Sequence, residues 1–237
     1  MKHTVIAITS WDDADKHTAK LFSLLERYKI QATFFVPIVA FRKRWINKEQ
    51  LMSLSEVQEI GSHTITHVDL TQLDDSHLSR EITHSKLVLE EIIGKRVTSF
   101  CYPCGRYDAN VVKHVKHAGY SCARTRVKYS LENPRDLFKI KTTLQASKQY
   151  LLSKQTIRAL RLLRLGSKLL LDDWVELAKH LFDRALARGG VYHLWGHAWE
   201  VEKKNEWKKL EELLTYIANR PNVKYVTLGQ YASTLEA

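Results

Sequence analysis

Short apolar runs alternate with amphipathic stretches along most of this 237-residue chain. The runs at residues 3–9 and 32–37 are rich in β-branched and aromatic residues, which is typical of buried strands. The stretches at residues 15–29 and 76–93 place apolar side chains at helical spacing, and Gly94 after the second is a common helix terminator. Strands that alternate with helices in this way predict parallel βαβ units.

The alternation continues toward the C-terminus, so about seven such units are expected in an α/β fold. That number favours a distorted (β/α) barrel over an open sheet, and enzymes with such barrels carry their active sites at the C-terminal ends of the strands. Glycine and proline are scarce and no linker-like segment interrupts the chain, so residues 1–237 are expected to form one domain, with residues 128–171 as an insertion or lid. The other expected helices are 48–60, 109–118, 173–187 and 206–218, and the other expected strands are 98–102, 121–126, 191–194 and 224–228.

The composition excludes several classes of protein. The formal net charge is +11, but the basic residues are scattered along the predicted helices, which favours solvated helix faces over a nucleic-acid-binding stripe. Three cysteines do not predict a disulfide framework and fit a reducing compartment. The N-terminal apolar run is too short for a secretory signal, and no run approaches the roughly 18 apolar residues of a membrane span. A cytoplasmic protein without a membrane span is therefore expected.

Polar residues gather where the predicted strands end. Asp12 and Asp13 follow the first strand, and either one alone is explained as a helix cap, although a cap needs only one carboxylate. His63 and His67 have the i, i+4 spacing that places two imidazoles on one face of a helical turn, which suits a shared metal ion. With Asp13 they would leave coordination positions open for water and substrate, as a catalytic zinc requires.

A third cluster, YPCGRY, follows the predicted strand at 98–102. Cys101, Cys104, His114 and His117 offer an alternative structural zinc site there, but their spacing is shorter than that of zinc fingers. A turn that presents backbone amides to a ligand is the favoured interpretation.

The fourth cluster, YHLWGHAWE at residues 192–200, closes a short predicted strand with several rings around a glycine. Aromatic faces stack on sugar C–H groups and histidine titrates near neutral pH, so this segment suits a sugar-binding site. His193 is also explained as a satisfied core residue, because it alternates with Tyr192 and Leu194 along the strand.

In order and spacing these clusters resemble the motifs of the polysaccharide deacetylase family, also called the NodB-homology or carbohydrate esterase 4 family. Each motif alone is a weak signal, whereas six in order are a strong one, and they extend from about Val5 to Tyr231. The resemblance implies a NodB-type deacetylase fold. The matching segments are Ser10-Trp11-Asp12-Asp13-Ala14, Ala32-Thr33-Phe34-Phe35-Val36, His63-Thr64-Ile65-Thr66-His67, Tyr102-Pro103-Cys104-Gly105, Asp173-Trp174 and Leu194-Trp195-Gly196-His197.

The resemblance also implies a role for each matching residue. Asp13, His63 and His67 would bind a divalent metal, with zinc expected and cobalt or nickel as alternatives. Asp12 would act as the general base and His197 as the general acid. The backbone N–H of Cys104 would stabilise the oxyanion, and Asp173 would belong to the catalytic set. The residues expected to contact the substrate are Trp11, Tyr102, Pro103, Trp174 and Trp195.

Three positions depart from the family pattern. Ala14 replaces a glycine, which is tolerable if the turn does not require a positive φ. Cys104 replaces a residue that is commonly aromatic. Cys101 replaces the arginine that orients the catalytic aspartate in many members, and Arg106 and Arg124 are the two candidates to substitute for it.

The favoured function is metal-dependent removal of N-acetyl groups from an acetylated glycan. The basic residues at 128–171 lead us to expect contact with an anionic polymer. The same site would serve an O-acetyl esterase or a hydrolase of non-sugar amides. The missing arginine at Cys101 leaves a catalytically silent carbohydrate-binding homologue as a third interpretation, and the charge alone leaves a nucleic-acid-binding protein as the least favoured one.

Overall fold

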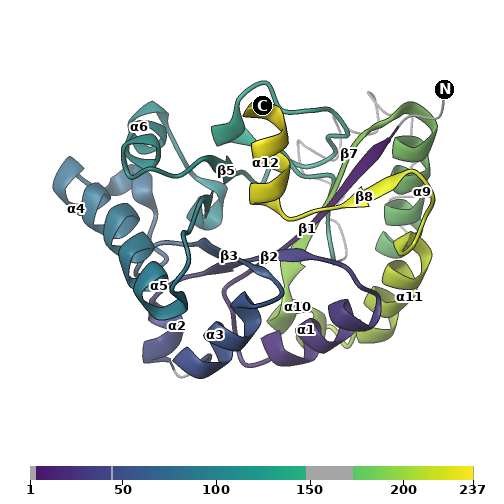
Figure 1. Cartoon of the computed structure of the whole chain (residues 1–237), viewed down its shortest axis with the longest axis horizontal. Coiled ribbons are helices and arrows are strands. Elements are labelled where there is room, and N and C mark those ends of the chain that lie inside the picture. The colour runs from purple at the N-terminus through teal and green to yellow at the C-terminus, as the bar shows by residue number, and fades with distance from the viewer. Residues whose placement is uncertain (1–3, 44, 148–172, 237) are drawn as a thin grey trace.

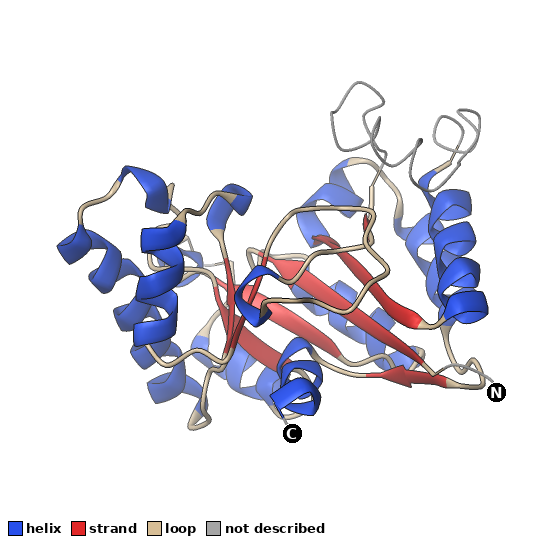
Figure 2. Ribbon diagram, turned by 90° about the horizontal axis from the view of Figure 1, so that it is seen from above, coloured by secondary structure: helices blue, strands red, loops and turns tan. Residues whose placement is uncertain are grey.

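A computed structural model describes residues 4–43, 45–147 and 173–236 of the chain. Its parallel strands form one curled sheet with helices packed around it (Figure 1, Figure 2). Seven strands lie in the order β5-β4-β3-β2-β1-β7-β6, and β8 pairs with β1 outside this path. The strands are β1 (Val5–Asp12), β2 (Ala32–Val36), β3 (Glu59–Ser62), β4 (Ser99–Cys101), β5 (Cys122–Arg124), β6 (Leu144–Gln145), β7 (Gly190–His197) and β8 (Val223–Tyr225).

The central strand is β1, with which three other strands pair. It pairs with β7 along its whole length, from Val5 opposite Gly190 to Asp12 opposite His197. Its first residues also pair with β8, whereas its last residues, from Thr9 onward, pair with β2. The partner of β1 on the edge away from β7 is therefore β8 near its start and β2 near its end. The aligned C-terminal ends of β1 and β7 bring Asp12 and His197 together.

Residues 140–145 join the two edges of the curled sheet. Ile140 forms a parallel bridge with Arg124 of β5, and the two residues of β6 pair with β7. The predicted distorted (β/α) barrel is thereby confirmed. Residues 140–145 of the expected insertion or lid at 128–171 are thus part of the barrel. Residues 148–171 lie outside the described residues.

The helices pack on the outer face of the sheet, where the larger apolar core lies. A smaller core fills the barrel interior and includes Ile8, Phe35 and Cys101 of the strands together with Leu228 and Tyr231 of the last helix. That helix closes the N-terminal end of the barrel, which leaves the C-terminal end for a site. The helices are α1 (Thr18–Arg27), α2 (Val39–Arg42), α3 (Lys48–Ser55), α4 (Asp75–Ser79), the π-helical turn η2 (Arg80–His84), α5 (Ser85–Ile93), α6 (Ala109–His117), α9 (Trp174–Arg188), α10 (Ala198–Lys203), α11 (Trp207–Ile217) and α12 (Leu228–Glu236).

The structure corrects two expected elements. The helix expected at 48–60 ends at Ser55, and Glu59–Ser62 form β3 instead. Gly61 is required in this strand because a Cβ there would lie 2.5 Å from the Phe35 ring. The strand expected at 224–228 ends at Tyr225 and is followed by α12. None of the described helices is long and apolar enough to cross a membrane.

Candidate active site

The carboxylates of Asp12 and Asp13 are directed differently because β1 ends between them. Asp12 is its last residue and lies inside the barrel with 5% exposure. Asp13 begins the following turn with a φ of 77° and donates its backbone N–H to the Phe35 carbonyl oxygen at 3.0 Å. Ala14 continues the turn with a φ of 45°. The turn therefore does adopt the left-handed conformation for which the family uses glycine, and Ala14 adopts it at a steric cost.

His63 and His67 lie on a loop after β3, not on the helical turn that their spacing predicted. The loop bends back at Thr64 and His67, whose φ angles are 69° and 60°. Glu81 of η2 accepts hydrogen bonds from the backbone N–H groups of Ile65 and Thr66, both at 2.9 Å. The Glu81 carboxylate, which comes from outside the loop, therefore holds the loop in the conformation that directs both imidazoles toward Asp13.

The Nε2 atoms of both histidines face Asp13. Its Oδ1 lies 3.9 Å from His63 and 3.5 Å from His67, and the three ligand atoms lie within 4.8 Å of one another. His63 donates Nδ1–H to the Cys101 carbonyl oxygen at 2.7 Å, which leaves the Nε2 lone pair directed at this point. Burial lowers the pKa of His63 to about 4, so its ring is neutral at physiological pH, as a metal ligand must be. This donor set fits a divalent cation such as zinc.

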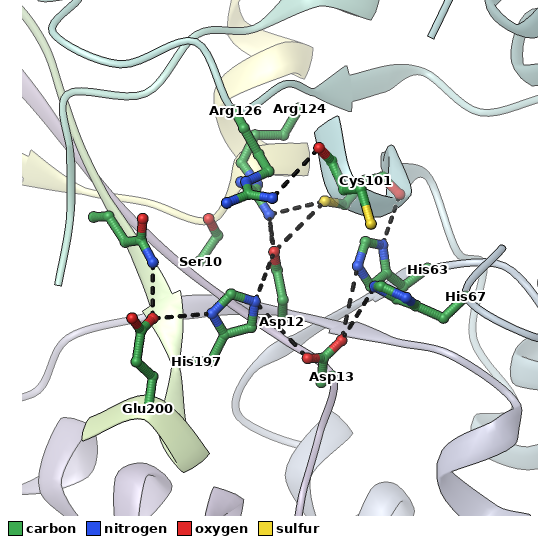
Figure 3. Close-up of polar contacts among 12 residues, drawn as sticks. Ser10, Asp12, Asp13, His63, His67, Cys101, Arg124, Arg126, His197 and Glu200 are labelled. Carbon is green, nitrogen blue, oxygen red and sulfur yellow. Dashed lines mark hydrogen bonds and ion pairs between the residues drawn. The ribbon is translucent and has the colours of Figure 1, made fainter. Parts of the chain in front are cut away.

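Arg124 of β5 binds Asp12 in the barrel interior (Figure 3). Its Nη2 contacts both carboxylate oxygens and lies 2.8 Å from the Cys101 Sγ. Burial by itself raises the pKa of Asp12, but Arg124, His63 and His197 together lower it to about 2. Asp12 is therefore ionised at neutral pH. Arg106, the other candidate, instead pairs with Asp69 at 2.6 Å.

His197, at the end of β7, lies across from the metal-ligand candidates (Figure 3). Its Nε2 is 4.0 Å from Asp12 Oδ2 and 3.8 Å from Asp13 Oδ2, while its Nδ1 is 3.4 Å from Glu200 Oε2. Glu200 is itself held by Gln145 at 2.8 Å and by Lys204 at 2.7 Å. Burial lowers the pKa of His197, but Glu200 and the two aspartates outweigh it, so the pKa is raised above that of a free imidazole.

A cavity of about 390 Å³ brings these groups together. Cys104 reaches it from a turn in which its φ is 55°. The described residues that line the cavity are Asp12, Asp13, His63, His67, Cys104, Arg126, Lys128, Gln145, Ser147, His197, Trp199 and Glu200.

Other residues predicted at the substrate lie elsewhere. Trp11, Tyr102 and Trp174 are at most 3% exposed and belong to the outer apolar core, and Pro103 is buried as well. For Trp11 the reason is strand alternation: when Asp12 points into the barrel, its neighbour must point out. Trp195 does line a second, adjoining cavity.

The structure also separates Asp173 from the catalytic set. Its side chain accepts a hydrogen bond from the Val175 N–H, and so caps α9, and it pairs with Lys209 at 3.1 Å. The alternative zinc site is likewise not assembled. His114 pairs with Asp75 at 3.3 Å, and His117 Nδ1 bonds the carbonyl oxygen of Lys113 at 2.7 Å.

Six of the cavity residues were not among the site residues predicted from the sequence: Arg126, Lys128, Gln145, Ser147, Trp199 and Glu200. Glu200 lies three residues after His197, and this spacing at the start of a helix was the available signal. Trp199 donates Nε1–H to Asp13 Oδ2 at 3.1 Å. Gln145 comes from β6, a two-residue strand that no periodicity reveals.

Glu200→Gln is expected to change the pH dependence of any reaction in which His197 acts as an acid. Glu200 raises the pKa of His197, so the substitution lowers that pKa. An acid must be protonated, and its activity is lost as pH rises through its pKa. The alkaline limb of kcat against pH should therefore move to lower pH while metal content stays constant. An unmoved limb would rule out this coupling.

The fold and the site define a member of a known class. The family model described as polysaccharide deacetylase matches residues 1–123, and the chain belongs to that family. The matched half contains Asp12, Asp13, His63 and His67, whereas Arg124 and His197 lie beyond it.

Individual relatives agree with this assignment. A peptidoglycan-N-acetylglucosamine deacetylase from Bacillus cereus is 34% identical over 117 residues, which is 49% of this chain and 54% of the relative. The chain thus aligns with about half the length of that relative. Among solved structures, a putative polysaccharide deacetylase from Mycobacterium smegmatis has a TM-score of 0.76 at 16% identity, covering 100% of this chain and 91% of that one, and shows the same fold. A polysaccharide deacetylase from Bacillus cereus has a TM-score of 0.51 at 26% identity, covering 57% and 46%.

Proposed function

We propose that this protein is a metal-dependent hydrolase that removes acetyl groups from the nitrogen of an N-acetylated sugar or polysaccharide. The observation that carries the proposal is the convergence of Asp13 with His63 and His67, with Asp12 and His197 beside them. Family membership and the relatives that deacetylate peptidoglycan support a carbohydrate substrate.

The residues divide the reaction between them. A divalent cation held by Asp13, His63 and His67 would supply a positive charge that acidifies water and polarises the acyl oxygen. Asp12, ionised through its contact with Arg124, accepts the proton of the attacking water.

His197 completes the reaction on the leaving-group side. Its Nε2 donates a proton to the departing nitrogen, because an amine is a poor leaving group unless it is protonated. The backbone N–H of Cys104, at the turn beside the cavity, donates to the oxygen that becomes negatively charged.

The missing family arginine motivated a silent, carbohydrate-binding alternative. Arg124 supports the catalytic proposal against it, because its guanidinium contacts Asp12 from the neighbouring strand. An O-acetyl esterase would use the same groups, because a departing sugar alkoxide also needs a proton, so the substrates in the assay below distinguish the two.

Metal removal is the direct test of the proposal. Protein dialysed against a chelator is expected to lose acetate release from N-acetylated oligosaccharides, and zinc, cobalt or nickel should restore it. His67→Ala should weaken metal binding and prevent restoration, whereas His117→Ala, at the C-terminal end of α6 and outside the cavity, serves as the matched control. Acetate release that persists in metal-free protein would contradict the proposal, and release from O-acetyl esters alone would favour the esterase.

A further inference from the structure

Trp199 of α10 differs from the other tryptophans of the chain in its exposure. All six tryptophans lie among the described residues, and Trp199 is the one whose side chain is exposed, at 39%. Four of the others belong to the larger apolar core or pack against it. Single exposed apolar side chains are common on protein surfaces, but Trp199 lines the cavity that holds the proposed catalytic residues. Its indole is therefore accessible where the substrate must lie.

Two contacts fix the orientation of this indole. Its Nε1–H donates to Asp13 Oδ2 at 3.1 Å, and its ring lies against the His197 ring, with 5.1 Å between the ring centres and 39° between the ring planes. The hydrogen bond leaves Asp13 Oδ1, which faces His63 and His67, available to the proposed cation. The indole is thus held in place before any ligand binds, which lowers the entropic cost of binding against it.

The position of Trp199 follows from the proposed roles of its two neighbours. Asp13 would hold the cation that polarises the acyl oxygen, and His197 would donate a proton to the departing nitrogen. In an N-acetylated sugar that nitrogen is bonded directly to the sugar ring, so the ring must lie close to His197. The His197 imidazole contacts the Trp199 indole, which places the sugar ring next to the accessible part of the indole.

We propose that Trp199 binds the sugar residue that carries the acetamide, with the C–H groups of one pyranose face stacked on the indole. The electron-rich face of an aromatic ring attracts such C–H groups, and stacking also removes apolar surface of both rings from water. This proposal rests on the proposed function and specifies its substrate class. It requires a ring with an apolar face beside the acetamide and therefore disfavours an acyclic amide.

A binding measurement tests the proposal. N,N′-diacetylchitobiose is titrated into zinc-loaded Asp12→Asn protein, which should not consume it, and the affinity is measured by calorimetry. Adding Trp199→Leu should weaken binding by about 5- to 50-fold, as expected for truncation of a tryptophan at the centre of a binding site. Trp199→Phe retains an aromatic face and should retain most of the affinity. Trp207→Leu, on α11 and outside the cavity, is the control and should leave the affinity unchanged.

The two Trp199 variants also separate stacking from the orientation of Asp13. Both lack the indole N–H, so any disturbance of Asp13 is common to them, and elemental analysis should show equal zinc content. A difference in sugar affinity between them therefore reports on the aromatic face. If Trp199→Phe lost as much affinity as Trp199→Leu, or if Trp199→Leu bound the sugar as well as its parent, the proposal would be overturned.

Turnover with Asp12 intact provides a second readout. Trp199→Leu should lower kcat/KM for the disaccharide, mainly through KM. It should leave kcat/KM unchanged for N-acetylethanolamine, which carries the same acetamide without a ring. An equal loss with both substrates would overturn stacking, because Trp199 would then act only through Asp13.

The binding and turnover results distinguish this proposal from the proposed function. Sugar binding that depends on the aromatic face, without release of acetate, would support the role of Trp199 and contradict the hydrolase. Release of acetate from the disaccharide, together with an affinity that Trp199→Leu does not change, would do the reverse. Absence of measurable sugar binding would also overturn the role of Trp199.

Discussion

Arg124→Met is expected to lower the free energy of unfolding by about 3 to 5 kcal/mol, the usual cost of leaving one member of a buried ion pair without its partner. Arg124 is 0% exposed and Asp12 is 5% exposed, so little water reaches either group. Without the guanidinium, the largest effect that lowers the pKa of Asp12 is lost and this pKa rises, and the carboxylate also loses the contact that orients it as a base. Urea unfolding measures the loss of stability, and acetate release measures the loss of the base.

Two further variants separate the charge from the packing. Asp12→Asn combined with Arg124→Met removes both charges and should destabilise less than the sum of the single changes, because neither charge is left alone. Arg135→Met, an exposed arginine, should change stability by no more than about 0.5 kcal/mol. A loss below about 1 kcal/mol in Arg124→Met would be too small for a buried ion pair and would refute the assigned role.

Relocating the arginine tests its position directly. Cys101 and Arg124 are register partners on β4 and β5, so Cys101→Arg combined with Arg124→Cys returns the guanidinium to the position usual in the family. This double variant is expected to recover more activity than Arg124→Cys alone.

Asp12→Asn is expected to reduce kcat for deacetylation by about 10² to 10⁴, the range for loss of a general base. Asparagine retains the shape and one hydrogen-bond acceptor for Arg124 but cannot take a proton. Metal content, measured by elemental analysis, should be unchanged, because the proposed ligands are Asp13, His63 and His67.

His197→Ala should reduce kcat by a similar factor and also retain the metal. If either variant turned over at nearly the wild-type rate, the corresponding role would be wrong. If either lost its metal, the residue would belong to the ligand set instead.

Local motifs were sufficient to predict the metal-ligand candidates. Asp13, His63 and His67 follow strands, and parallel strands bring such positions to one end of a barrel. Motif membership did not reveal which face of a strand a residue occupies. Trp11 and Tyr102 lie within motifs but point into the outer core, because neighbouring side chains on a strand alternate.

The sequence by itself determined the fold class, the end of the barrel that carries the site, and the carboxylate and imidazoles that converge there, because each depends on short-range order along the chain. Only the tertiary structure decided which arginine reaches Asp12 and which carboxylate holds His197. Arg124 lies 112 residues from Asp12 in the sequence. It reaches Asp12 because of the register in which the strands of the sheet are aligned. Glu200 is fixed by Gln145 of a strand too short to show a period. Such contacts depend on how strands align in space, and no local pattern encodes that alignment.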